Sequence, residues 1–305
     1  MPARAAVFVT DTLPSEARGA LEGFEVFEEQ ADDDALARCQ ALICWPYKVK
    51  GETFRKMKGL RMVQTMSAGV DKLDFASLPA GVQVFSNAGA FTESVAEHAW
   101  GMLLGVAKGI HLRNQRTTPR ELRGKTLLVL GAGAIGSEVA RLSKSLRMKT
   151  IGVSRSFRVP GEFDETAPVS SLGDRIREAD AVVMALPLTK ATKGLVDYDL
   201  LSRAKEAVLA VNVGRAELIP EADLLRWLKE RSESRFATDV FWVKDGREAY
   251  SSPAWDLHNF AGTLHISGVP LGEDLSRVKA AAAKNVRRYF ETGEAVNHVD
   301  VSEYL

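Results

Sequence analysis

Short apolar blocks alternate with more polar stretches along the first hundred residues of the chain. Blocks rich in β-branched and aromatic residues are typical of strands, and the polar stretches between them suit helices. The predicted strands cover 5–9, 41–45, 60–65 and 82–85, and a helix is predicted over 14–21. Strands that alternate with helices predict a mostly parallel sheet with helices on both faces.

A change of pattern at Thr92 predicts one long helix that ends near Lys108. Apolar residues recur there at spacings of three and four, which is the period of a helix. Ser94 can cap this helix, and Glu97 follows three residues later, as in a capping box. The next stretch, 113–123, is polar and contains a proline, so it is expected to be a loop.

A second alternation of strands and helices begins at Lys125 and runs to about Gly268. Its predicted strands cover 126–130, 149–153, 181–185, 208–213, 236–240 and 263–266, and a last helix is predicted over 273–289. The pattern therefore predicts an α/β chain with two Rossmann- or flavodoxin-like, doubly wound parallel-sheet domains. We assign 1–93, completed by 270–305, to the first domain and 94–269 to the second, and we expect a ligand-binding cleft between them.

Composition narrows the classes of partner. The 305 residues carry 40 Lys and Arg against 40 Asp and Glu, so the net charge gives no reason to expect nucleic acid or an anionic membrane as a partner. Cys39 and Cys44 fit neither a disulfide framework nor a zinc pattern, and no metal site is expected. The N-terminus lacks a signal-peptide layout, and the longest apolar runs are far shorter than the ~18 residues that span a bilayer. We expect a soluble protein of a reducing cytoplasm.

A glycine-rich turn follows the predicted strand 126–130 and precedes a helical pattern. It reads Gly131-Ala132-Gly133-Ala134-Ile135-Gly136. In the dinucleotide-binding fingerprint, the first glycine permits a tight turn, the second lets the backbone approach the pyrophosphate, and the third lets helix and strand pack closely. The helix N-terminus then offers N–H groups and a positive dipole end to the phosphates. The second domain is therefore predicted to bind a dinucleotide through Gly131, Gly133, Ala134, Ile135 and Gly136.

The end of the next predicted strand indicates which dinucleotide is preferred. NAD sites usually have a carboxylate there, which accepts a hydrogen bond from the ribose 2′-hydroxyl. Here Ser154, Arg155 and Ser156 occupy this position, with Arg158 nearby. Hydroxyl and guanidinium groups bind a 2′-phosphate, whereas a carboxylate repels it. We predict a preference for NADP(H), with NAD(H) as the alternative if Arg155 is only a surface charge or stacks on the adenine.

Four further segments follow predicted strands and carry groups suited to chemistry: 64–71, 211–215, 238–240 and 264–268. In open α/β sheets, ligands bind at the carboxyl ends of the strands. These segments, together with 94–99, the glycine turn and 185–194, resemble the D-isomer-specific 2-hydroxyacid dehydrogenases. The similarity extends over nearly the whole chain.

The resemblance implies a role for each strand-end residue. Arg215 would bind the carboxylate and carbonyl of a 2-oxo acid, and His265 would exchange a proton with the substrate oxygen. The loop of Ser67, Ala68 and Gly69 would present backbone N–H groups to the substrate carboxylate. The implied cofactor contacts also include Asp239, which would hold the nicotinamide carboxamide, and Leu186, Pro187, Thr192 and Val213. Family members are typically homodimers, so the resemblance implies a homodimer joined through the helix 92–108.

One position departs from the family pattern. The family usually has a glutamate five residues after the aspartate of the Asp-Val-Phe segment, where it pairs with the histidine. This chain has Lys244 there. An insertion could bring Asp245 or Glu248 to His265 instead, of which Glu248 is our preferred candidate, or no carboxylate reaches the histidine. The other histidines, His98 among them, are expected to be structural or on the surface.

Three functions remain open at this point. The leading hypothesis is an NADP(H)-dependent enzyme that reduces a small 2-oxo acid similar to glyoxylate or hydroxypyruvate. The second is an NAD-dependent dehydrogenase of D-3-phosphoglycerate or another D-2-hydroxy acid. The third is a non-enzymatic, dinucleotide-sensing protein similar to co-repressors of this fold. Arg215 and His265 argue against the third, because a sensor needs neither group.

Overall fold

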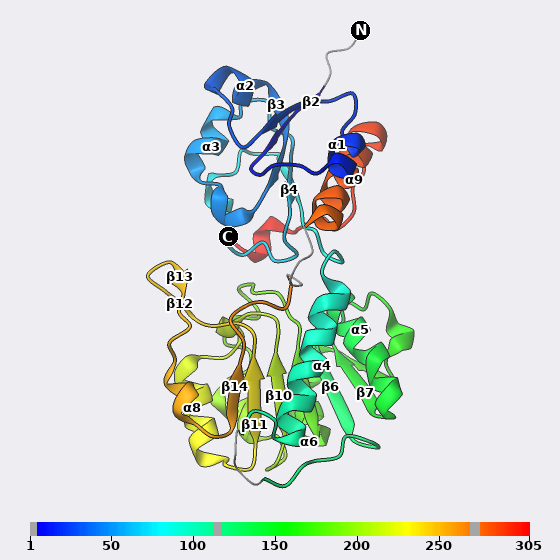
Figure 1. Cartoon of the computed structure of the whole chain (residues 1–305), viewed down its shortest axis with the longest axis vertical. Coiled ribbons are helices and arrows are strands. Elements are labelled where there is room, and N and C mark those ends of the chain that lie inside the picture. Colours follow the sequence, from blue (N-terminus) through cyan, green and yellow to red (C-terminus); the bar gives the residue numbers. More distant parts are fainter. Residues whose placement is uncertain (1–4, 113–116, 269–274) are drawn as a thin grey trace. The chain divides into compact units, whose positions relative to one another are not determined.

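The computed structural model of the chain describes residues 5–112, 117–268 and 275–305. The chain divides into two compact units, Met1–Phe91 with Leu271–Leu305, and Thr92–Pro270 (Figure 1). Both units are α/β with parallel sheets, which confirms the predicted fold class. The divisions lie within two residues of the predicted domain boundaries at 93/94 and 269/270.

The first unit is built on a five-stranded parallel sheet with the order β2-β1-β3-β4-β5. Alternate residues of its strands enter opposite cores: Ala6 and Phe8 pack on one side of the sheet, and Val7 and Val9 pack on the other. Helices α1 and α9 cover one face, and α2 and α3 cover the other (Figure 1). The elements are β1 (Ala6–Val9), α1 (Ser15–Ala20), β2 (Glu25–Glu28), α2 (Asp33–Arg38), β3 (Cys39–Cys44), α3 (Gly51–Lys56), β4 (Met62–Thr65), β5 (Gln83–Phe85) and α9 (Ser276–Thr292).

The second unit is built on a seven-stranded parallel sheet with the order β14-β11-β10-β9-β6-β7-β8. The strand order reverses between β6 and its neighbours β7 and β9, and such a switch point is where open α/β sheets bind ligands. Helices α4 and α5 pack against each other and against the sheet, and α6, α7 and α8 enclose the opposite core. The elements are α4 (Thr92–Lys108), β6 (Thr126–Leu130), α5 (Ala134–Ser143), β7 (Lys149–Val153), β8 (Glu165–Ala167), α6 (Leu172–Glu178), β9 (Ala181–Met184), α7 (Tyr198–Ser202), β10 (Leu209–Asn212), α8 (Glu221–Glu230), β11 (Arg235–Thr238) and β14 (Phe260–Gly262).

Short elements connect these helices and strands. A two-stranded antiparallel hairpin, β12 (Val243–Lys244) and β13 (Arg247–Glu248), lies between β11 and β14 in the sequence. Single 3-10 turns lie at Pro46–Lys48, Phe75–Ser77, Lys144–Leu146, Pro160–Glu162, Val169–Ser171, Ala216–Leu218, Pro253–Asp256 and Val301–Glu303. The described part of the chain contains no helix long and apolar enough to cross a membrane.

Two local predictions are wrong. The strand predicted over 263–266 is not formed, because β14 ends at Gly262 and His265 has a φ of 54°, which no strand residue adopts. Ser94 is not the N-cap of the long helix, because α4 begins at Thr92 and the Ser94 hydroxyl donates to the carbonyl of Ser267 at 2.5 Å. Part of the predicted loop 113–123 and the first residues of the helix predicted over 273–289 lie outside the described residues.

Both cysteines are free thiols buried in the first unit. Burial raises the pKa of Cys39 to about 11, and the nearby carboxylate of Glu25 acts in the same direction. Burial also raises the pKa of Cys44. Because the thiolate is the reactive form, both side chains behave as core residues.

Close backbone packing shapes the turn between β6 and α5. Gly131 has a φ of 96°, and a Cβ built on it would lie 2.7 Å from the carbonyl oxygen of Ala185. A Cβ on Gly136 would lie 1.8 Å from the carbonyl oxygen of Gly131. Gly133 differs from both, since a Cβ there would meet nothing within 4 Å. Two of the three glycines are therefore required by the fold itself.

We expect Gly136→Ala to lower the free energy of unfolding of the second unit by about 3 kcal/mol, because the added methyl group must displace backbone. Gly133→Ala is the matched control on the same turn and should lower that free energy by about 1 kcal/mol or less, because alanine is a poorer N-cap residue than glycine but meets no neighbour there. Urea unfolding followed by tryptophan fluorescence measures both. Equal stability of the two variants would contradict the packing described for this turn.

Candidate active site

The turn after β10 holds Arg215 in place. Asn212 is buried; its Oδ1 accepts the N–H of Gly214 at 3.0 Å, and its Nδ2 donates to the carbonyl of Arg215 at 2.9 Å. The guanidinium of Arg215 donates through Nη1 to the carbonyl of Gly214 at 2.8 Å. One buried amide thus fixes both ends of the turn. The result is a half-buried cation at the carboxyl end of a central strand.

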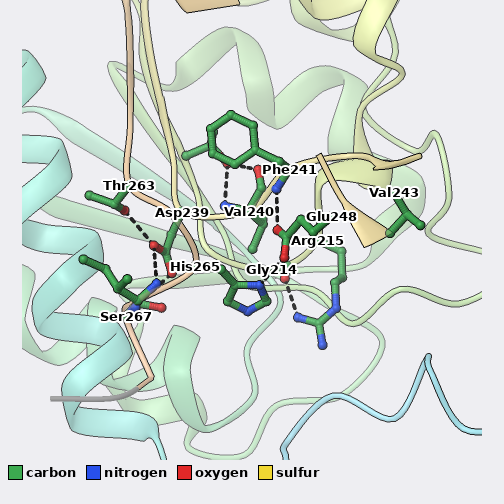
Figure 2. A network of polar contacts seen from close by, with 12 residues as sticks. Gly214, Arg215, Asp239, Val240, Phe241, Val243, Glu248, Thr263, His265 and Ser267 are labelled. Carbon is green, nitrogen blue, oxygen red and sulfur yellow. Dashed lines mark hydrogen bonds and ion pairs between the residues drawn. The ribbon is translucent and has the colours of Figure 1, made fainter. Parts of the chain in front are cut away.

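The β12–β13 hairpin brings Glu248 to His265 (Figure 2). Asp245 and Gly246 form its tip with φ values of 52° and 75°, the conformation that favours an Asp-Gly turn. Lys244, which stands where the family has a glutamate, forms an ion pair with Glu221 at 2.9 Å. The structure therefore places Glu248, and neither Lys244 nor Asp245, beside the histidine.

The contact between Glu248 and His265 fixes the state of the imidazole. Oε2 of Glu248 lies 2.6 Å from Nδ1 of His265, and Oε1 accepts the backbone N–H of Phe241 at 2.6 Å. A carboxylate can only accept, so Nδ1 carries a proton and Nε2 is the nitrogen that can exchange one. The carboxylate side chain is 11% exposed and the imidazole 36% exposed, so the carboxylate is the more buried partner of the pair.

A buried carboxylate, that of Asp239, lies on the other side of His265 from Glu248 (Figure 2). Its Oδ1 accepts from the hydroxyl of Thr263 at 2.6 Å and from the N–H of Ile266 at 2.9 Å, and its Oδ2 accepts from the N–H of Ser267 at 3.0 Å. Burial raises the pKa of Asp239, but these hydrogen bonds together outweigh burial and hold the pKa below its ordinary value. Asp239 is thus an ionised group that organises the segment around His265.

The start of α5 has the features of a phosphate-binding site. Gly133 is the exposed N-cap residue, and no side chain caps the helix. Ala134 and Ile135 are half-buried and begin the helix, so their N–H groups belong to the first turn, which has no intrahelical partners. The open space beside Gly133 admits a group that approaches the backbone closely. These residues fit a dinucleotide pyrophosphate.

The segment after β7 returns to this turn. The N–H of Arg158 donates to the carbonyl of Ala132 at 3.0 Å, and the N–H of Ser156 donates to the hydroxyl of Ser154 at 3.4 Å. Ser156, Arg155 and Arg158 are exposed, and Ser154 is half-buried. Positive charge and hydroxyl groups therefore lie beside the glycine turn, with no carboxylate in the segment 154–158.

Leu186 lies between two glycine turns. A Cβ on Gly131 would lie 3.1 Å from its nitrogen, and a Cβ on Gly214 would lie 2.6 Å from its carbonyl oxygen. The hydroxyl of Thr192 donates to the carbonyl of Pro187 at 2.6 Å, and the N–H of Val213 donates to the carbonyl of Met184 at 3.0 Å. The predicted cofactor residues 186, 187, 192 and 213 thus follow β9 and β10 along one edge of the sheet.

Ser67, Ala68 and Gly69 form a half-buried loop after β4 of the first unit. The hydroxyl of Ser67 donates to the carbonyl of Gly69 at 2.6 Å, and the carbonyl of Ser67 accepts from the N–H of Asn87 at 3.0 Å. The loop is therefore fixed by its own hydrogen bonds at the carboxyl edge of the first sheet.

Sequence reasoning missed several members of the second unit's site. The backbone of Phe241 and the hydroxyl of Thr263 are each joined to His265 through one residue, Glu248 and Asp239 respectively, and the imidazole of His98 is joined to it through Thr263 and Asp239. His98 was expected to be structural or on the surface; its signals in the sequence are its place in the family-like segment 94–99 and its polarity in a largely apolar helix. A cavity of about 300 Å³ runs along α4 beside His98 and Thr263 but contains none of the predicted site residues.

Comparisons with known proteins agree with this arrangement. Residues 82–267 match the family described as D-isomer specific 2-hydroxyacid dehydrogenase, NAD binding domain. A glyoxylate reductase of Aeropyrum pernix is 30% identical over 249 residues, which are 76% of this chain and 69% of that protein. A hydroxypyruvate reductase of Thermotoga maritima is 28% identical over 297 residues, which are 90% of this chain and 95% of that protein.

A solved structure supports the same relationship. A protein of Pyrobaculum aerophilum is 32% identical, with a TM-score of 0.85, over 98% of this chain and 99% of that one. The glycine turn, the Arg215 turn and the paired His265 all lie within the span that the family model matches. The chain therefore belongs to the D-isomer specific 2-hydroxyacid dehydrogenases, a family of oxidoreductases that use a nicotinamide dinucleotide.

Proposed function

We propose that this chain is an NADPH-dependent reductase of small 2-oxo acids similar to glyoxylate or hydroxypyruvate, and that it forms the D-2-hydroxy acid. The observation that carries the proposal is the pairing of His265 with Glu248 in the same unit as the fixed cation Arg215. Reduction of a carbonyl requires a hydride at carbon and a proton at oxygen. A binding protein needs neither a poised acid nor this pairing.

The side chains supply the acid and the positive charge. Arg215 would bind the substrate carboxylate and draw electron density toward the carbonyl oxygen, because a guanidinium offers a planar fork of donors. Nε2 of His265 would donate a proton to that oxygen as the hydride reaches the carbonyl carbon. Glu248 would hold the imidazole in the correct orientation and tautomer.

A bound nicotinamide supplies the hydride in reduction and accepts it in oxidation. The first turn of α5 would hold the pyrophosphate, and Ser154, Arg155 and Ser156 would bind a 2′-phosphate. The N–H groups of the Ser67–Gly69 loop would bind the substrate carboxylate. Asp239 stays the predicted partner of the nicotinamide carboxamide, but its carboxylate is fully buried and already accepts hydrogen bonds from Thr263, Ile266 and Ser267, so this contact requires one of those donors to be displaced.

Initial rates with NADPH and NADH against glyoxylate, hydroxypyruvate, pyruvate and longer 2-oxo acids test the proposal. We expect turnover of the small acids, with kcat/KM at least about tenfold higher for NADPH. Arg155→Gln should remove most of this preference by raising the KM for NADPH, because it removes the charge that binds the 2′-phosphate. Lys144→Gln, which removes a charge paired with Glu162, is the matched control.

The other results of this screen decide between the earlier alternatives. Oxidation of D-3-phosphoglycerate with NAD as the one efficient reaction would replace the proposed substrate and cofactor. Absence of any turnover, with dinucleotide binding intact by fluorescence titration, would favour a sensor. A clear preference for NADH would refute the proposal that Ser154 and Arg155 bind the 2′-phosphate of NADPH.

We expect Glu248→Gln to lower kcat for reduction about a hundredfold, because the amide keeps the shape of the side chain but loses its charge. The variant also loses the carboxylate acceptor that fixes the tautomer and ring position of His265. Glu217→Gln is the control on a carboxylate that accepts from the N–H of Val243. An unchanged kcat in Glu248→Gln would remove Glu248 from the mechanism.

We also propose that the protein is a cytoplasmic homodimer joined through α4. Its free thiols support a reducing compartment, and Gly101 supports the interface because nothing lies within 4 Å of a Cβ built there. Sedimentation at micromolar concentration should give twice the chain mass of 33.3 kDa. Gly101→Arg fits the single chain and should reduce the mass to that of one chain. A monomeric wild type would refute the interface.

A further inference from the structure

The segment that carries His265 has an unfavourable backbone conformation. His265 has a φ of 54°, a left-handed value that costs a non-glycine residue free energy. The residues on either side give no packing to offset that cost, because Leu264 is 51% and Ile266 54% exposed. Polar contacts must therefore hold the segment in place. We call residues 263–267 the histidine loop.

Asp239 supplies most of these contacts. Its backbone carbonyl accepts the N–H of His265 at 2.8 Å. Its carboxylate accepts from Thr263, Ile266 and Ser267, as described above. Both ends of the histidine loop are thus held by one buried residue.

Helix α4 holds the same loop at two further points. The hydroxyl of Ser94 donates to the carbonyl of Ser267 at 2.5 Å. Nε2 of His98 lies 2.8 Å from the hydroxyl oxygen of Thr263. Ser94 and His98 are four residues apart, so they occupy neighbouring positions on one face of the helix. Each contacts one end of the histidine loop.

The protons of this network can be assigned by elimination. Asp239 is ionised and can only accept, so the single hydroxyl proton of Thr263 points to Oδ1 of Asp239. The oxygen of Thr263 must then accept from His98, which requires a proton on Nε2 of His98. A directional chain results, from the imidazole of His98 through the hydroxyl of Thr263 to the carboxylate of Asp239.

We propose that His98 is a positioning residue for the reaction, which fixes the histidine loop, and with it His265, through Thr263 and Asp239. The inference rests on the proposed function for its kinetic consequence, but not for its proton assignment. Packing does not account for the residue, because the His98 side chain is 22% exposed and borders the cavity along α4. Its Nε2–H donor is the feature that the network uses.

Two substitutions at His98 separate the donor from the ring. A glutamine side chain carries an N–H at about the same reach as Nε2, so His98→Gln should retain kcat within about threefold. His98→Leu removes the donor and should lower kcat about tenfold, since small displacements of a catalytic group slow the chemical step. Dinucleotide affinity should stay unchanged in both, because His98 lies outside the phosphate site. A lower kcat with an unchanged dinucleotide affinity distinguishes a positioning role for His98 from a general disruption of the fold.

Further variants control for changes in the cavity and the helix. Met102 lines the same cavity without contacting the network, so Met102→Leu should leave kcat unchanged. Thr263→Val, which keeps the shape but removes the hydroxyl, should lower kcat at least as much as His98→Leu, and Thr263→Ser should restore it. Equal kcat in the wild type and His98→Leu would overturn the proposal.

The proton assignment can be tested without turnover. Nitrogen-15 NMR of histidine-labelled protein separates the five imidazoles, and the His98 signal is the one that disappears in His98→Gln. We expect a proton on Nε2 of His98 and a changed His265 signal in His98→Leu. A neutral His98 protonated on Nδ1 alone, or an unchanged His265 signal, would refute the chain of contacts. Failure of all 2-oxo acids to react would instead count against the proposed function and leave this readout intact.

Discussion

The buried charge of Asp239 is the constraint on which the geometry of the site depends. An ionised carboxylate inside a protein is unfavourable unless donors replace the water that it loses. The donors that do so here, Thr263, Ile266 and Ser267, all belong to the histidine loop. To donate to the Asp239 carboxylate, the chain leaves the β ladder after Gly262, and His265 takes its left-handed conformation.

The rest of the site depends on how closely the strand ends pack. Leu186 is confined between Gly131 and Gly214, and a side chain on either glycine would collide with the backbone. The phosphate turn and the Arg215 turn are thereby held in one layer at the carboxyl edge of the sheet. Glycine thus acts twice, at the turn that would receive the dinucleotide and at the turn that presents the cation.

Hydrophobic periodicity predicted the interior of the fold well and its margins poorly. Strands β6 and β7 and helix α4 have the predicted bounds, because buried central elements carry an unbroken apolar signal. The edge strands β2 and β8 were not predicted, since they are short and partly exposed and contain polar residues. The strand predicted over 263–266 is absent, and its apolar residues Leu264 and Ile266 are 51% and 54% exposed. The period of apolar residues indicates which positions are apolar. It does not indicate which backbone N–H groups will donate hydrogen bonds to a buried carboxylate.

The candidate site shows the same limit at the level of single residues. Arg215 and His265 were identified because they follow strands in a recognisable pattern, whereas Glu248 reaches the histidine through a hairpin that shifts the family position. The Asp-Gly tip at 245–246 is a local signal for that hairpin, so this change can be read in the sequence. His98 has no such signal, because its partner Thr263 lies 165 residues away in the chain. The role of His98 depends on the hydroxyl of Thr263, whose only proton is donated to Asp239. These contacts exist only in the folded molecule, so the sequence alone does not indicate them.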